Sequence, residues 1–261
     1  SLGDPLGIIK NNETQKILLD QVVPQNSTAF LSIPFNNPLE TEDAFKLWVL
    51  HHNVALEEIK LEGLKTIDEI GWIEIGSESV LLFHSQNEIQ TQEKLIPILE
   101  NSKKYRKVSY YPVKLPQDLL VFTAAIGGKV TPNWGCIIDG FFVFTSSEEA
   151  IKTVISSYKD GSTLASSIIY NTFKEELASK SSIYWIAQSK LLIESWKNKE
   201  ENKNPFSKID TERYPLVGFQ GVFENGFMHL HLRIHKNELE KQENAVSNQY
   251  LVQLDAPLGR A

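Results

Sequence analysis

Three histidines lie close together in one short segment of the chain. The segment GFMHLHLRIHKN, residues 226–237, contains His229, His231 and His235. Histidine is the commonest metal ligand in proteins, and a catalytic zinc site typically needs three protein ligands with a fourth position left open. The spacing therefore allows two interpretations, a metal site or the polar side of a β-strand.

The residues around the histidines favour the strand. Asn225-Gly226 is a strong signal for a two-residue hairpin turn, since a type I′ turn needs positive φ at both central positions. Side chains alternate along a strand, so one side of this hairpin is uniformly apolar, and we expect that side to face the core. The histidines then point away from the core. The pairs predicted on the apolar side are Phe223–Met228, Gly221–Leu230, Phe219–Leu232 and Val217–Ile234.

Two of the three histidines could still share a metal ion. His229 and His231 are two residues apart on one side of the strand, roughly 7 Å from each other, whereas His235 is roughly 13 Å beyond His231. The residues opposite them, Val222 and Gln220, are poor zinc ligands. His229 and His231 are thus the candidate metal ligands, and a third ligand would have to come from a distant segment. The favoured interpretation is a strand with no metal and no cofactor.

No other segment carries a catalytic signature. The sequence lacks G-x-S-x-G, P-loop, G-x-G-x-x-G and H-E-x-x-H motifs. Ser156 and Lys159 match S-x-x-K, but the companion S-D-N and K-T-G elements are missing. The single cysteine, Cys136, has no basic neighbour in sequence and is expected to be a small buried hydrophobe. We therefore predict no catalytic residues.

Composition and charge limit the classes of protein to which this chain can belong. The 261 residues are 41% hydrophobic and 23% charged, which is typical of a folded globular protein. The net charge of -7 argues against nucleic-acid binding, which requires a basic face. The one basic cluster, residues 103–107, is interpreted as the end of a helix, where cations are favoured. No apolar run reaches the roughly 18 residues that a membrane span needs.

Hairpins followed by helices recur along the chain. Residues 71–85 and 134–146 each read as a hairpin, and each is followed by an S-x-x-E capping box that predicts a helix start. The segments LLFHSQNE (81–88) and FVFTSSEE (142–149) align at an offset of 61 residues. This offset indicates two related hairpin-helix units, with chance similarity of local motifs as the alternative.

The predicted fold class is α+β, with a mainly antiparallel sheet built from hairpins and interspersed helices. The chain forms either one domain or two closely packed lobes, roughly 20–118 and 119–238, with a tail at 239–261. The chain begins at Ser1 and its only methionine is Met228, so we expect a piece of a longer protein.

Other elements expected are a strand at 27–33, a helix from Thr41 towards Gly63, a helix from 85 towards Asn101, a helix at 168–177, a strand at 181–187, a short helix through Leu191 and Trp196, a polar loop at 197–213, and the hairpin at 214–236.

Residues 121–173 carry a family resemblance. The order there is hairpin, strand ending in serine, helix, Gly-Ser-Thr-Leu and a short helix ending in phenylalanine, followed by the strand SSIYWIA at 181–187. This succession resembles uncharacterised bacterial cell-envelope proteins whose α+β region can precede a predicted β-propeller. The resemblance implies a periplasmic or cell-surface location and no known chemistry, so it carries over no functional residues.

The leading hypothesis is a non-catalytic binding or assembly domain of a larger extracytoplasmic envelope protein, with an unidentified protein or glycan as partner. One alternative is a metal-dependent hydrolase that uses His229 and His231. Another is a carbohydrate- or peptidoglycan-binding module, in which Trp72, Trp134 and Tyr110-Tyr111 would form a stacking platform.

Overall fold

The computed structural model describes residues 13–36, 38–54, 64–95, 101–126, 130–197, 210–224 and 227–237. The strands are β1 (Ala29–Pro34), β2 (Ile67–Ile75), β3 (Glu78–Ser85), β4 (Lys103–Tyr105), β5 (Val108–Pro112), β6 (Trp134–Ile138), β7 (Phe141–Thr145), β8 (Ile183–Gln188), β9 (Leu216–Glu224) and β10 (Phe227–His235). The helices are η1 (Leu19–Gln21), α2 (Pro38–His51), α3 (Glu88–Leu95), α4 (Gln117–Ala125), α5 (Glu148–Lys159), η4 (Leu164–Ser166), α6 (Ile168–Glu175) and α7 (Ser189–Lys197).

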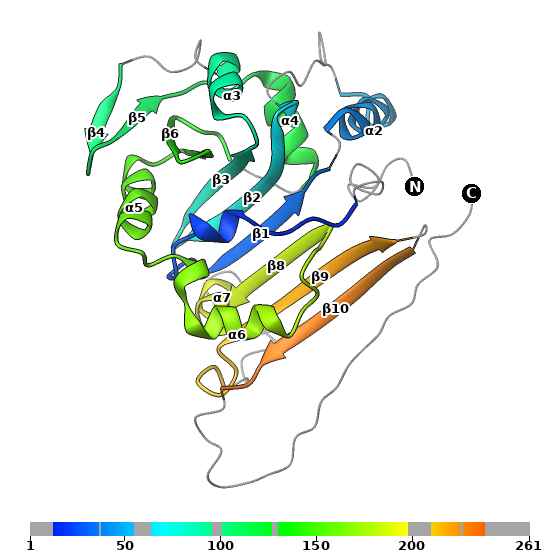
Figure 1. Cartoon of the computed structure of the whole chain (residues 1–261), viewed down its shortest axis with the longest axis vertical. Helices are drawn as coiled ribbons and strands as arrows, with labels where there is room; N and C mark the ends of the chain where they lie inside the picture. The colour runs from blue at the N-terminus through cyan, green and yellow to red at the C-terminus, as the bar shows by residue number, and fades with distance from the viewer. Residues whose placement is uncertain are drawn as a thin grey trace, which may run out of the picture.

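All of these strands join one sheet, in the order β10-β9-β8-β1-β2-β3-β7-β6-β5-β4 (Figure 1). Every neighbouring pair is antiparallel. The predicted α+β class with a mainly antiparallel sheet is therefore confirmed. This one sheet contains strands from both of the segments considered as lobes, 20–118 and 119–238. It ends at β4 on one edge and at β10 on the other (Figure 1).

Helices cover both faces of the sheet, because strand side chains alternate between two apolar sides. On one face, Phe30 and Val143 pack in a cluster with η1, α5 and α6; we call this the α5/α6 face. On the other, Ile33 and Phe144 pack in a cluster with α2 and α4; we call this the α2/α4 face. Each such fully buried Ile, Val or Phe contributes roughly 1.5–3 kcal/mol to stability.

The two hairpins expected from the 61-residue offset are present and lie side by side. β2–β3 and β6–β7 meet where β3 pairs with β7. Leu82 pairs with Val143, and the difference 143 − 82 is the predicted offset of 61. The flanking pairs are Leu81 with Phe144 and Phe83 with Phe142. The same offset takes Leu81 to Phe142 and Phe144 back to Phe83, so it converts one of these pairs into the other. The hairpins are thus related by a local two-fold axis at the Leu82–Val143 pair.

The predicted capping boxes are wrong by one or two residues. α5 is capped by Ser147, whose Oγ accepts the backbone N–H three residues on at 3.3 Å. α3 is capped by Asn87, whose Oδ1 accepts a hydrogen bond from Gln90 N at 3.1 Å. The predicted cap serine before α3 stays in β3, and Glu88 instead accepts a hydrogen bond from Gly140 N at 2.7 Å. Thr41, the predicted cap of the next helix upstream, lies inside α2, and the predicted continuation over 55–63 is outside the described residues.

The basic cluster at 103–107 is not a helix end. It forms β4 and a turn in which Arg106 and Lys107 have positive φ of 49° and 69°. Arg106 makes a bidentate ion pair with Asp160, at 2.8 and 2.6 Å, and Lys103 binds Glu148 at 2.9 Å. Glu148 and Asp160, at the two ends of α5, bind the cations of this cluster and hold it as a hairpin. Both carboxylates are distant in sequence from the cluster.

Candidate functional site

The β9–β10 hairpin has the predicted register. Phe223 pairs with Met228 and Val217 with Ile234, and the pairing runs unbroken from Glu224–Phe227 to Leu216–His235. The turn residues 225–226 lie outside the described residues. The prediction succeeded because a two-residue turn leaves one register.

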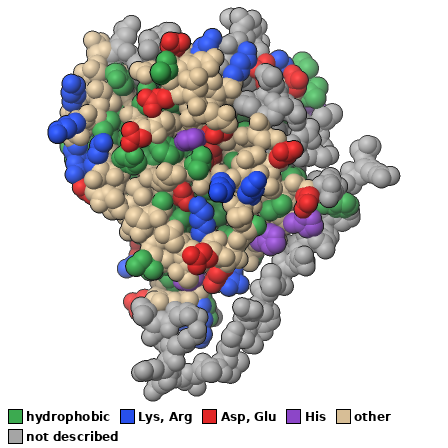
Figure 2. Space-filling view, viewed as in Figure 1, with side chains coloured by type: hydrophobic (Ala, Val, Ile, Leu, Met, Phe, Trp, Pro, Cys, Tyr) green, Lys and Arg blue, Asp and Glu red, His purple; other side chains and the backbone are tan. Residues whose placement is uncertain are grey.

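The predicted orientation of this hairpin is wrong, because the histidines lie on the covered α5/α6 face. His235 is 7% exposed, and its ring centroid is 6.3 Å from that of Phe173 in α6. Arg233 Nε donates to a carboxylate oxygen of Glu176 at 2.5 Å. Figure 2 shows histidine side chains on the face that carries α5 and α6. Arg233 and His235 thus face α6 and the residue that follows it, whereas His229 and His231, on the same face, are half-buried.

Gly218 explains this orientation. A Cβ built on Gly218 would lie 2.9 Å from Phe173 Cζ, so only glycine leaves room for Phe173 against β9. Gln220, two residues on, is buried on the same side, where its amide binds the backbone of Ala178 and Lys180 at 2.7–3.0 Å. The segment that follows α6 is therefore held on the side of the hairpin that the apolar pattern had assigned to solvent.

The apolar side of the hairpin is partly exposed. We call Met228, Leu230, Leu232 and Ile234 the apolar row. Its cross-strand neighbours on the α2/α4 face include Phe219, whose ring stacks on Trp185 at 5.6 Å. Leu232 and Ile234 are 53% and 49% exposed. The exposed side chains of the apolar row are thus neighbours along one edge strand rather than scattered single residues.

The candidate metal ligands are placed as the register predicts. His229 and His231 share a face, with Val222 and Gln220 opposite them. The side chain of Gln220 is engaged by backbone groups, as described above. Among the residues that the structure describes, no group of three or more His, Cys, Asp or Glu is placed to hold a metal ion. A metal bound by His229 and His231 stays the alternative hypothesis, beside the favoured one of a strand without metal.

The aromatic residues considered for glycan stacking do not form one platform. Trp72 is buried on the α2/α4 face, whereas Tyr110 is buried on the α5/α6 face. Trp134 packs beside Tyr110, with 5.6 Å between ring centroids, and Lys103 lies over its ring at 4.6 Å. Cys136 is buried, and burial raises the pKa of its thiol. These side chains belong to the core and its margin.

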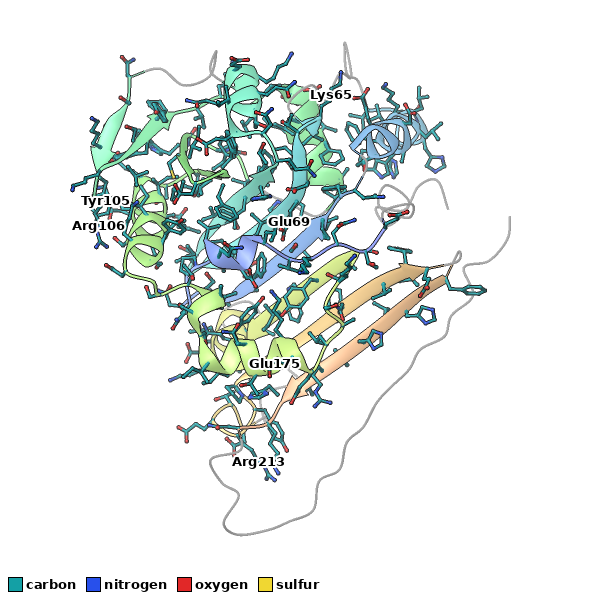
Figure 3. The ribbon with its side chains drawn as sticks, in the orientation of Figure 1. Lys65, Glu69, Tyr105, Arg106, Glu175 and Arg213 are labelled. Atoms are coloured by element: carbon teal, nitrogen blue, oxygen red, sulfur yellow. The ribbon has the colours of Figure 1, made fainter. Side chains whose placement is uncertain are left out.

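A buried carboxylate on β2 was missed by sequence reasoning. Glu69 is 1% exposed and lies in the middle of the sheet near η1 (Figure 3). Its carboxylate accepts hydrogen bonds from Leu18 N at 2.7 Å, Leu19 N at 3.1 Å and Ser32 Oγ at 2.5 Å. Burial raises the pKa of Glu69 to about 7. All three donors are protein groups, so Glu69 docks η1 onto the sheet; its signal is an acidic residue within an apolar strand.

Asp20 gives η1 a second polar anchor. It is buried, accepts a hydrogen bond from Tyr170 Oη at 3.1 Å and forms an ion pair with Lys174. Burial is the largest cause that raises the pKa of Tyr170, so this phenol stays a proton donor. The Asp20 cluster and Glu69 together attach the segment before β1 to α6 and β2.

The two edges of the sheet differ in how they are protected. β4 has three residues and carries Lys103 and Lys104, a short charged edge that discourages pairing with another chain. β10 has nine residues, contains no lysine, proline or glycine, and pairs with β9 without a bulge. No described residue pairs with its outer side. Within the part of the chain that the structure describes, the β10 edge thus lacks the lysine, proline, bulge or covering segment that usually protects an edge strand.

Hydrogen bonds beside β9 show which backbone groups of β10 point outward. Pro215 O accepts from Ser189 N, and Gly221 O accepts from Ser182 N, both at 2.9 Å. Backbone groups alternate sides along an antiparallel strand, so odd-numbered residues of β9 face β8 and even-numbered ones face β10. On β10, odd-numbered residues therefore bond to β9. The N–H and C=O groups of the apolar row point away from the sheet.

Comparison with known proteins identifies no family for this chain. No protein-family model matches the sequence, and no curated protein matches it either. Crystal form I of TP0453 matches with a TM-score of 0.45 and 11% identity, over 89% of this chain and 81% of that one. Crystal form III of TP0453 gives 0.46 and 11%, over 84% and 80%. Neither carries an argument about function. In the described part of the chain, no helix is long and apolar enough to cross a membrane.

Proposed function

We propose that this chain is a non-catalytic binding or assembly domain of a larger extracytoplasmic envelope protein, and that it binds another polypeptide along β10. The observation that carries the binding proposal is a nine-residue edge strand whose outward backbone groups belong to half-exposed apolar residues. The envelope location is supported by the resemblance of residues 121–173. A cytoplasmic location of the full-length gene product in cell fractions would contradict that part of the proposal.

Strand addition is the binding mode that fits such an edge. An incoming strand gains backbone hydrogen bonds, while its alternate side chains contact the apolar row and add specificity. Burying Leu232 and Ile234 would add roughly 25 cal/mol for each Å² of apolar surface removed from water. A glycan gains less, because it needs polar partners, and the row offers only outward backbone groups.

Leu232→Lys is expected to weaken binding of a capped nonapeptide of alternating Val and Thr at least about tenfold, or about 1.4 kcal/mol. The lysine replaces an apolar contact with a charge that must be desolvated. Fluorescence anisotropy of labelled peptide measures the affinity. Ile89→Lys is the matched control, because Ile89 is 73% exposed on α3.

Three results would contradict the proposal: no peptide binding by the wild type, equal binding by Leu232→Lys, or an equal loss in Ile89→Lys. Elemental analysis tests the hydrolase alternative. Stoichiometric zinc in the wild type that is lost in His229→Ala would favour that alternative over a binding domain.

A further inference from the structure

We infer that the strand that pairs with the β10 edge is β10 of a second copy of this chain. The inference rests on the proposed function, since it names the partner of the same edge. Two copies related by a two-fold axis perpendicular to the sheet present identical strands in antiparallel directions, which is the orientation of every neighbouring pair in this sheet. The pairing would continue the sheet from one copy into the other.

The sequence of β10 is complementary to itself in this arrangement. Full overlap of Phe227–His235 places Leu230 opposite the partner's Leu232, and Met228 opposite the partner's Ile234. These four residues are the ones whose backbone groups point outward, so each such pair can exchange two hydrogen bonds. The two apolar rows then lie on one face and cover each other's half-exposed side chains. One register thus satisfies the backbone and buries the row.

The charges of the strand favour a neutral partner such as itself. Arg233 is the one Lys, Arg, Asp or Glu within β10, and its guanidinium is paired with Glu176 of the same chain at 2.5 Å. A second copy therefore meets no unpaired formal charge of these types on the strand. An acidic or basic peptide would gain little from it. β4, the other edge, offers only three residues, of which Lys103 is paired with Glu148 and the exposed Lys104 places a positive charge at the edge.

Cysteine cross-linking tests both the partner and the register. In the full-overlap register, His231 lies opposite the partner's His231 on the two-fold axis, as a pair that does not exchange hydrogen bonds. Cα atoms of such pairs are about 4.5 Å apart, which is within disulfide range. His231→Cys is expected to give an intermolecular disulfide under mild oxidation, at least about tenfold more than His229→Cys.

His229→Cys is the matched control. It lies on the same face of the same strand, but its copy in the partner is four residues away, roughly 13 Å. The native Cys136 is buried and gives little background. Sedimentation equilibrium supplies the second readout: the wild type is a dimer, Leu232→Lys raises its dissociation constant at least about 30-fold, and Ile89→Lys leaves it unchanged. The dissociation constant of the dimer should change more than that of the peptide complex, because a symmetric dimer contains the substituted residue twice at its interface.

The two assays distinguish failure of the second-copy inference from failure of the proposed function. A monomeric wild type without the His231→Cys disulfide, but with peptide binding that Leu232→Lys weakens, overturns the second copy and leaves the proposed function intact. A dimer that is insensitive to Leu232→Lys, or one that cross-links better through His229→Cys, also overturns this inference. A wild-type protein that neither dimerises nor binds the peptide overturns both the second copy and the proposed function.

Discussion

Glu69→Gln is expected to abolish a pH dependence of about 3 kcal/mol in the free energy of unfolding. The pKa of Glu69 is about 7 in the folded protein, against 4.5 ordinarily. The folded state therefore binds the proton more tightly than the unfolded state. The stability contributed by this group is fully present below pH 4.5 and is lost as the pH rises through 7. A difference of 7 − 4.5 in pKa corresponds to about 3 kcal/mol at 1.36 kcal/mol per unit.

Glutamine keeps the hydrogen bonds of this site without the charge. Its carbonyl can accept from Leu18 N and Leu19 N, and its NH₂ group can donate to Ser32 Oγ. Glu69→Gln should therefore match the wild type near pH 4 and exceed it by about 3 kcal/mol near pH 8. Urea unfolding at several pH values measures this. Glu74→Gln, on the exposed part of the same strand, is the control and should keep the wild-type slope.

Alanine at position 69 separates ionisation from hydrogen bonding. Glu69→Ala leaves the Leu18 and Leu19 amides without their acceptor, at about 1–3 kcal/mol for each buried group. It should therefore destabilise the protein below pH 6, where Glu69→Gln does not. If Glu69→Gln followed the pH dependence of the wild type, the elevated pKa would not be the source of that dependence.

The sequence predicts the strand pairings that depend on a short turn motif. Asp139-Gly140 has φ of 48° and 85°, as the type I′ turn between β6 and β7 requires. The Asn225-Gly226 signal similarly gave the register of β9 and β10. The apolar face of α5, with Ile151 and Val154 buried, follows from helical spacing. In each case, the residues that determine the structure are neighbours in sequence.

The orientation of the hairpin could not be predicted, because it depends on distant residues. Alternation shows which residues share a side, but a sheet with helices on both faces has no unique core side. Gly218 accepts Phe173 on the histidine side, and this contact joins two segments 45 positions apart, since 218 − 173 is 45. The basic hairpin at 103–107 was missed for the same reason, because its partners Glu148 and Asp160 lie far along the chain.

Gly71→Ala is the second change with a large expected effect, because Gly71 and Glu69 dock η1 together. A Cβ at position 71 would lie 2.7 Å from Leu19 Cδ1 and 2.8 Å from Leu31 O. Leu19 is fully buried, and the backbone oxygen of the neighbouring strand cannot move without disturbing the sheet. We expect a loss of about 3 kcal/mol in the free energy of unfolding, at the upper end of overpacking costs.

Hydrogen exchange locates this effect. In Gly71→Ala, the Leu18 and Leu19 amides should exchange faster as η1 is displaced from Glu69, while β3 and β7 keep their protection. Gly76→Ala is the comparison, because nothing lies within 4 Å of its Cβ and only its positive φ of 61° is strained, at about 1 kcal/mol. If Gly71→Ala and Gly76→Ala lowered the free energy of unfolding equally, and hydrogen exchange at Leu18 and Leu19 stayed unchanged, Gly71 would not be the residue that makes room for η1. The predicted pattern instead requires that one face of β2 both accepts the hydrogen bonds of η1 and leaves space for its leucine.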